Sequence, residues 1–437
     1  MSGTPPKATA TSPFREAVEG FVHDLDAIWG SLPPLMVMSW AVRKSACEKW
    51  NKWLEENGKS RRMIEGKAAY KIEVSKIPKT DRLERKRRRA ETAYELLPKS
   101  SLVSLVSAYD AFLGRLLRAA IESQPKVLNR SGKSMTFEEL SGFPDMAAAR
   151  SSVVSSVIES VMRESHIKQF DWMQDTFNVK LRVGLDCWPD FVEITQRRNL
   201  FVHCRGVVSS QYVKVCKENG ASTSDIVVGD CLDASREYLD EAHACLYEIG
   251  VKLSQVLWRK LVPNETAKAD SSLANITYEL LVARRYGVVK RLLSFAVDVL
   301  PNVSSEDYER TFLLNLAQAH LFSGERDACR ARVSSKDWSA SGLSYKISVA
   351  VLLEDYENAA QLMAPAASAG EMPEENYYEW PLFRKYRKSG EFAAASKEVF
   401  GERAMSPQRI VATGGQQEAG QRTSAADTSF GEGIFED

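Results

Sequence analysis

The chain has 437 residues, of which 44% are hydrophobic and 27% charged, and its 58 Lys and Arg residues balance its 58 Asp and Glu residues. This length predicts two or three domains, and the composition is typical of a soluble globular protein. No run of about 18 apolar residues predicts a membrane span, and the first residues lack the apolar core of a signal peptide. We therefore expect a cytoplasmic protein with no membrane partner.

The cysteines and glycines do not indicate a metal or a cofactor. The seven cysteines are scattered and contain no Cys-x-x-Cys pair, whereas disulfide frameworks and zinc sites need regular spacing. The triplet Gly132-Lys133-Ser134 lacks the first glycine of a phosphate-binding loop, because Val127 stands at that position. We expect free thiols, no metal and no cofactor.

The N-terminal part, residues 13–94, is predicted to contain helices and a basic segment. Residues 1–12 are rich in Pro, Ser, Thr and Ala and are expected to be disordered. Apolar residues at helical spacing predict a first helix from Pro13 that ends at Gly30 and the Pro33-Pro34 pair. A second helix is predicted from about Leu35 to Glu56.

A basic segment follows these helices and contains five consecutive cations: Arg85, Lys86, Arg87, Arg88 and Arg89. Such a cluster predicts contacts with the phosphate backbone of RNA, since each neutralised phosphate releases counterions. A solvated helix face with Glu84 and Glu91 as local ion-pair partners explains the same charges. The sequence leaves both interpretations open.

Residues 95–262 are predicted to form an all-α bundle. Its first helix begins near Ser100, with an apolar stripe over 102–117 and Asp110 beside that stripe. Further helices are predicted over 147–166, around 170–177 and over 189–203. A Gly/Ser/Asp-rich interval then precedes a long amphipathic helix that ends near Val262.

The C-terminal part, residues 267–405, has a repeating pattern of apolar helix, short polar turn and small-residue helix. The turns recur at intervals of about 30–40 residues, which predicts helix-hairpin repeats of the tetratricopeptide type and a protein partner that binds them. Residues 406–437 are rich in Gly, Gln, Ser and Thr and end acidic, so we expect a disordered tail.

The stretch RRNLFVH crowds polar side chains onto a half-buried helix: Arg197, Arg198, Asn199 and His203. Such groups must be paired or must have a function. Asn199 and His203 are four residues apart and lie on one helix face. An imidazole, a permanently charged guanidinium and an amide that orients the ring suit phosphodiester cleavage. In the structural interpretation, Arg197 or Arg198 pairs with Glu193 and the histidine caps the helix.

The Arg-Asn-x-x-x-His pattern formed by Arg198, Asn199 and His203 resembles the motif of HEPN domains, which are four- or five-helix bundles. The opening helix YDAFLGRLLR and the stretch HCRGVVSSQYV after the motif also resemble this family. The resemblance covers residues 95–262. It implies a HEPN-like bundle with metal-independent endoribonuclease activity, in which a homodimer forms one composite site from two motifs.

The same resemblance implies a role for each motif residue. His203 would act as general base or acid on the 2′-hydroxyl or the leaving 5′-oxygen, and Arg198 would stabilise the charge on the phosphorane oxygens. Asn199 would position the imidazole or the scissile phosphate. Asp110 would pair with Arg198 or orient His203. Arg197 and the five cations of the basic segment are the candidate RNA contacts.

Two hypotheses of different classes follow. In the first, the chain resembles stress-response and phage-defence effectors, which couple a HEPN ribonuclease to an interaction domain. Its repeats, or the acidic tail lying over the basic segment, would restrain it. In the second, the chain is a non-catalytic dimerising scaffold or RNA-binding protein, and RRNLFVH is structural. The other histidines, at 23, 166, 243 and 320, stand alone in the sequence and are expected to be structural.

Overall fold

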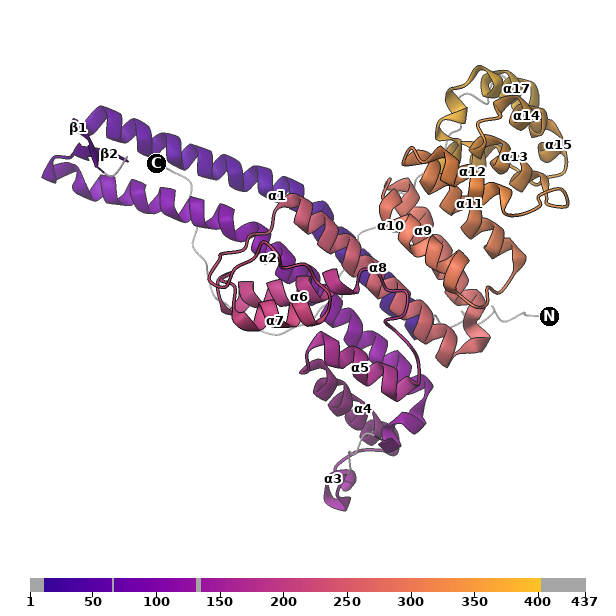
Figure 1. Ribbon diagram of the computed structural model, residues 1–437, viewed down its shortest axis with the longest axis horizontal. Helices are drawn as coiled ribbons and strands as arrows, with labels where there is room; N and C mark the ends of the chain where they lie inside the picture. The colour runs from indigo at the N-terminus through magenta and orange to yellow at the C-terminus, as the bar shows by residue number, and fades with distance from the viewer. Residues whose placement is uncertain (1–11, 65–66, 131–134, 402–437) are drawn as a thin grey trace, which may run out of the picture.

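In the computed structural model, the described residues, 12–64, 67–130 and 135–401, form an all-α protein with a single two-stranded hairpin. The helices α1 (Pro13–Asn57) and α2 (Ile77–Ser123) are antiparallel, and their distal halves form a protruding arm (Figure 1). At its tip lie the antiparallel strands β1 (Lys59–Ile64) and β2 (Lys67–Lys71) and the 3-10 turn η1 (Val74–Lys76). None of the described helices combines the length and apolar character that crossing a bilayer requires.

Shorter helices pack against the proximal halves of α1 and α2. After the 3-10 turn η2 (Pro125–Arg130), these are α3 (Phe137–Ser141), α4 (Met146–Met162), α5 (His166–Phe177), α6 (Trp188–His203), α7 (Ser210–Glu218) and α8 (Arg236–Leu261). The long, largely buried helix α8 lies between α6 and the C-terminal helices (Figure 1).

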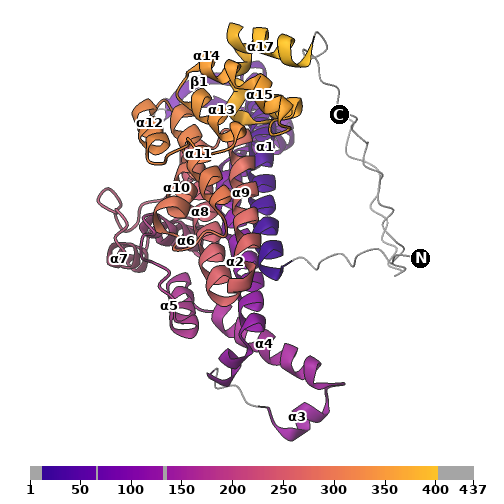
Figure 2. The same ribbon diagram turned by 90° about the vertical axis from the view of Figure 1, so that its right-hand side faces the viewer.

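The C-terminal helices stack as successive pairs (Figure 2). They begin with α9 (Thr266–Val282), α10 (Tyr286–Ser294) and the π-helical turn η4 (Phe295–Val299), followed by α11 (Glu306–Phe322), α12 (Arg326–Ser334), α13 (Leu343–Leu352) and α14 (Tyr356–Gln361). The remaining elements are α15 (Met363–Ser368), α16 (Glu374–Glu379), the 3-10 turns η5 (Pro381–Arg384) and η6 (Tyr386–Lys388), and α17 (Gly390–Phe400).

The first three C-terminal helix pairs share one turn geometry. A left-handed residue ends the first helix of each pair: Arg284, Gly324 and Glu354. The next amide donates back to the carbonyl five residues earlier, as from Arg285 to Leu280 (2.8 Å) and from Glu325 to His320 (2.9 Å). The amide of Asp355 does the same. This is the Schellman termination of a helix, which also ends α5, α7 and α15, at Asn178, Gly220 and Gly370.

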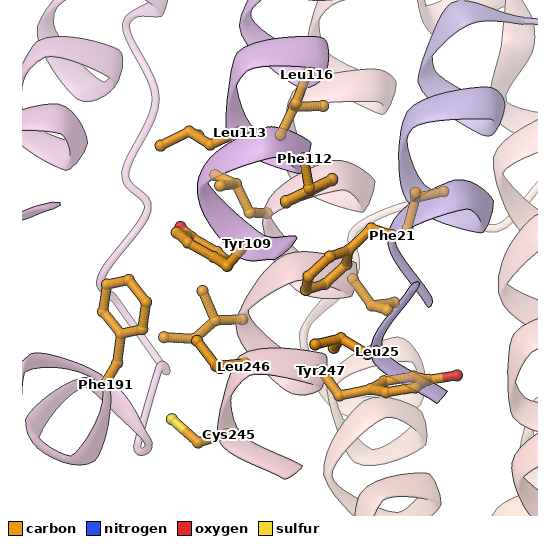
Figure 3. Close-up of a cluster of buried hydrophobic side chains, with 14 of the residues drawn as sticks. Phe21, Leu25, Tyr109, Phe112, Leu113, Leu116, Phe191, Cys245, Leu246 and Tyr247 are labelled. Carbon is orange, nitrogen blue, oxygen red and sulfur yellow. The ribbon is translucent and has the colours of Figure 1, made fainter. Parts of the chain in front are cut away.

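The main core lies where α1, α2, α6 and α8 meet (Figure 3). The ring of Phe21 stacks on Phe112 with centroids 4.4 Å apart, and Tyr109 meets Phe191 edge to face at 5.1 Å. Gly250 of α8 lies against Phe21. The same cluster of buried side chains continues into the C-terminal helices at residues such as Leu273 and Phe312, so the packing is continuous between the two parts of the chain.

The helix boundaries in the N-terminal part differ from the prediction. The predicted break at Gly30 and Pro33-Pro34 was wrong, because α1 continues through it, and α2 begins at Ile77 rather than near Ser100 and continues through Pro98. Each proline removes one helical hydrogen bond, but the two prolines of α1 point to solvent while Leu32 beside them is buried. Packing between α1 and α2 therefore outweighs the local signal to stop.

This change in boundaries joins the basic segment to the bundle. The predicted boundary at residues 94–95 falls in the middle of α2, so the cations of Arg85–Arg89 are on the same helix as Asp110. The helices predicted over 189–203 and before Val262 are confirmed as α6 and α8. The segments predicted to be disordered, 1–12 and 406–437, lie outside the described residues except for Ser12.

The seam of the arm uses cation–π contacts in place of an apolar heptad core. Arg43 lies 4.9 Å from the centroid of the Tyr94 ring, and Lys79 lies 4.3 Å from that of Trp53. The indole Nε1 of Trp53 donates to the hydroxyl of Thr80 at 3.0 Å. These contacts hold the two helices together with few buried aliphatic side chains.

We predict that Gly250→Ala destabilises the fold. The added Cβ would lie 2.1 Å from Cε1 of Phe21, whose ring cannot retreat because Phe112 stacks on it. Overpacking of this kind costs about 1–3 kcal/mol, to be measured by urea unfolding. The control is Gly114→Ala in α2, where no described atom beyond its own helix lies within 4 Å of the new Cβ. Equal stability of the two variants would contradict this account of the core.

Candidate functional site

The helix α6 presents the RRNLFVH motif at the end that faces solvent. Pro189 occupies its first turn, and its buried face carries Phe191, Ile194 and Leu200. The chain then reverses through Arg205 and Gly206, both with positive φ, and the amide of Gly206 donates to the carbonyl of Leu200 at 3.0 Å. A Cβ at Gly206 would lie 2.9 Å from the carbonyl oxygen of Leu232. This close approach fixes where α6 ends.

A polar cluster joins α2, α5 and α6 around Asp110. The guanidinium of Arg198 donates from Nη2 to Oδ2 of Asp110 at 2.9 Å and from Nη1 to Oδ1 of Asn199 at 3.1 Å. A 2.9 Å hydrogen bond joins Nε2 of His166 to the other oxygen of Asp110. Asp110 and Arg198 are about a quarter exposed, so solvent still reaches the pair. The cluster holds the guanidinium of Arg198 in one orientation.

His203 is the last residue of α6 and is exposed. Its ring makes no hydrogen bond or ion pair with any residue in the described ranges. Of the two roles predicted for Asp110, the ion pair with Arg198 is present, and no hydrogen bond joins Asp110 to His203 among the described residues. Asn199 accepts a hydrogen bond from Arg198, one helical turn before His203. The site therefore combines a fixed cation with an accessible imidazole.

Arg197 belongs to a separate, structural network. Its Nε donates to Glu193 at 2.6 Å, its Nη1 donates to the carbonyl of Asp233 at 3.1 Å, and its guanidinium lies over the Tyr238 ring. Tyr212 and Tyr238 donate to the two oxygens of Glu193 at 2.6 and 2.7 Å. Burial and the nearby carboxylate raise the pKa of the Tyr238 hydroxyl, which keeps its proton for this bond.

This network corrects the prediction for Arg197. The structural interpretation of the motif, a pair with Glu193, holds for Arg197, whereas Arg198 pairs across to α2. The side chain of Arg197 is only 14% exposed and is occupied by Glu193 and Asp233. We therefore remove it from the candidate RNA contacts.

In the basic segment, the ion pairs expected for a solvated helix face are present for two of the five cations. Arg87 pairs with Glu91 at 2.6 Å, and Arg88 pairs with Glu84, as expected for a solvated helix face. The other three cations are exposed and make no ion pair within the described part of the chain: Arg85, Lys86 and Arg89. Only these three remain free to meet a phosphate backbone.

His166 is the residue that the sequence analysis missed. It was expected to be structural because no partner was visible near it, yet it lies against Asp110 and opens α5 after the N-cap Ser165. The two residues are 56 positions apart, and no local pattern links them. Within the described residues, no three His, Cys, Asp or Glu side chains gather as metal ligands would.

Comparisons with protein families, curated proteins and solved structures return no match for this chain. A fixed guanidinium and an exposed imidazole on one helix can stabilise a developing negative charge and transfer a proton.

We predict that Asp110→Ala lowers the stability of the fold by about 1–3 kcal/mol, because Arg198 and His166 both lose a half-buried partner. Urea unfolding at neutral pH measures the change. The control is Asp24→Ala, whose ion pair with Arg115 is 3.4 Å long and nearly half exposed, and whose loss costs well under about 1 kcal/mol. If Asp110→Ala is no worse than this control, the cluster does not hold Arg198.

Proposed function

We propose that the chain is a metal-independent endoribonuclease of the HEPN type that acts on RNA in the cytoplasm. The observation that carries the proposal is the accessible imidazole of His203 on the helix whose Arg198 is held by Asp110. The Arg-Asn-x-x-x-His order within an all-α bundle supports the family assignment.

In this reaction the RNA supplies its own nucleophile. His203 takes the proton of the 2′-hydroxyl, and the 2′-oxygen attacks the adjacent phosphorus. The bond from phosphorus to the 5′-oxygen breaks, and that oxygen receives a proton from an imidazolium. Arg198 stabilises the charge on the non-bridging oxygens. The products are a 2′,3′-cyclic phosphate and a free 5′-hydroxyl, so DNA is not a substrate.

The two proton transfers favour a site made from two copies of the chain. Each copy contributes one accessible His203, so that one imidazole acts as base and the other as acid. The exposed apolar residues Val202 and Val207 flank His203, with exposed fractions of 49% and 43%. They provide apolar surface for a second copy at the end of α6, where the bundle would dimerise.

The C-terminal helices support regulation by a partner. We propose that α9 to α14 are repeats of the tetratricopeptide type, in line with their three matching Schellman turns. A pocket of about 340 Å³ between α9, α11 and α13 is lined by Asn275, Tyr345 and Trp380. The buried amide Nε2 of Gln318, also in this pocket, has no partner within the described residues.

This arrangement fits a stress-response or phage-defence effector that stays inactive until its partner signals. The pocket also favours the second candidate, a dimerising scaffold or RNA-binding protein without catalysis, since partner binding needs no active site. The proposed restraint by the acidic tail involves residues 406–437, which lie outside the described part of the chain. Activity of the α6 site decides between the two candidates.

We predict that His203→Ala lowers RNA cleavage in EDTA by about 10²–10⁴-fold, because general acid and base catalysis are lost. The assay follows labelled RNA and the 2′,3′-cyclic phosphate end group. The control is His23→Ala, which removes an exposed histidine from α1 and should leave cleavage unchanged. Equal cleavage by wild type and His203→Ala, or none by either, would favour the scaffold.

We predict that the active form has twice the chain mass of 48.8 kDa in light scattering. Val202→Asp should shift the protein toward monomer and lower cleavage together, because a charge in an apolar interface is costly. Val227→Asp, a change at an exposed valine in the loop after α7, serves as the control. A fully active monomer would rule out the composite site.

A further inference from the structure

The arm carries four cations along one side of α2: Arg82, Arg85, Lys86 and Arg89. They follow the spacing i, i+3, i+4 and i+7, so they form a single stripe on the helix surface. All four are exposed, and none makes an ion pair, a hydrogen bond or a cation–π contact with another described residue. We call this set the basic stripe.

The neighbouring cations of the arm are used differently. Arg87 pairs with Glu91 and lies over Trp50, and Arg88 pairs with Glu84. Lys59 pairs with Glu73 at the tip. The four cations of the basic stripe have no such partner among the described residues. Like charges at this spacing destabilise a helix, so the stripe is a cost to the fold in the absence of an anionic partner.

The basic stripe leads toward the candidate site. Lys99 of α2 lies two heptads beyond Arg85 and therefore faces the same side of the helix. Its ammonium is 5.6 Å from the centroid of the Phe201 ring, two residues before His203. From Arg89 to Lys99 the helix rises by about 15 Å. Figure 1 shows α6 alongside α2 at the level where the arm leaves the body.

We propose that the basic stripe binds the sugar–phosphate backbone of a single RNA strand and guides it to His203. This inference rests on the proposed function in one respect, namely that the bound RNA strand leads to His203 as the cleavage site. The exposed positions between the stripe and Lys99 are Thr92, Ala93, Glu95 and Leu96. None of them can stack on a base, and the carboxylate of Glu95 would repel a phosphate, so the contacts of the strand are those with the cations. The stripe therefore recognises phosphates without regard to sequence, and its affinity depends strongly on salt.

An anionic lipid surface is the other polyanion that such charges could meet. Surfaces that bind membranes interleave apolar side chains with cations, so that the apolar groups enter the headgroup layer. Between Arg82 and Arg89 the one apolar residue is Leu83, which is half-buried, so no apolar side chain is exposed among the four cations. The observations therefore favour RNA, and vesicle binding becomes an outcome of the test.

The test uses the full chain with His203→Ala, so that RNA is bound without being cut. Fluorescence anisotropy follows a labelled single-stranded RNA of mixed sequence over a series of salt concentrations. In this background, changing Arg82, Arg85, Lys86 and Arg89 to Gln should lower affinity at least tenfold. It should also reduce the slope of log K against log salt by about 3, since each phosphate contact on a single strand contributes about 0.7.

The matched control removes four exposed cations from the C-terminal helices: Arg326→Gln, Arg330→Gln, Lys385→Gln and Lys388→Gln. It changes the net charge equally and should leave the salt slope unchanged. Equal slopes for the two variants would overturn the proposal. Binding to vesicles containing phosphatidylserine, with none to RNA, would overturn it as well. Circular dichroism establishes that both variants are folded.

A cleavage assay with active His203 separates this inference from the proposed function. The stripe variant should cut long RNA at least tenfold more slowly than wild type does, yet cut a dinucleotide at the wild-type rate, because a dinucleotide cannot span from His203 to the stripe. Equal slowing on both substrates would overturn the guiding role. If wild type cuts neither substrate, the proposed function fails, and the loss of salt-dependent binding still decides whether the stripe binds RNA.

Discussion

The antiparallel pairing of α1 with α2 determines where every other element lies. The proximal halves of these helices form two walls of the main core, through contacts such as the stack of Phe21 on Phe112. Their distal halves form the arm, whose seam depends on aromatic rings and cations such as Trp53 and Lys79. The same two helices therefore pack through apolar side chains in the body and through cation–π contacts in the arm. Apolar burial stabilises the body, whereas in the arm few aliphatic side chains are buried and several, such as Val37, Met38 and Val42, are exposed.

Two polar networks connect α6 to its neighbours. The carboxylate of Glu193 accepts hydrogen bonds from Arg197 and from two tyrosine hydroxyls, and these bonds hold α6 to the elements that follow it. The carboxylate of Asp110 pairs with Arg198 and is hydrogen-bonded to His166, and these bonds join α6 to α2 and α5. Each carboxylate is satisfied on both oxygens, as half-buried charges must be. His203 belongs to neither network, and this separates it from the structural polar residues around it.

Much of this fold follows from local sequence, and the exceptions have identifiable physical causes. The helices α6 and α8 were predicted because their apolar periodicity and flanking turns agree. The break at Pro33-Pro34 was predicted wrongly, because proline acts locally whereas the pairing with α2 acts over the whole helix. The pairing of Arg198 with Asp110 and the hydrogen bond of His166 to the same carboxylate join segments that are distant in the sequence. Apolar periodicity does not determine such contacts.

The prolines of the two long helices have a mechanical consequence. Pro33 of α1 and Pro98 of α2 line the same pocket of about 460 Å³, so both helices lack backbone hydrogen bonds at one level. A pair of helices bends most easily where both are weakened together, so a hinge of the arm is expected at that level. Arg89 lies on the far side of the hinge and Asp110 on the near side. Bending at this hinge would change the distance between the arm and the end of α6.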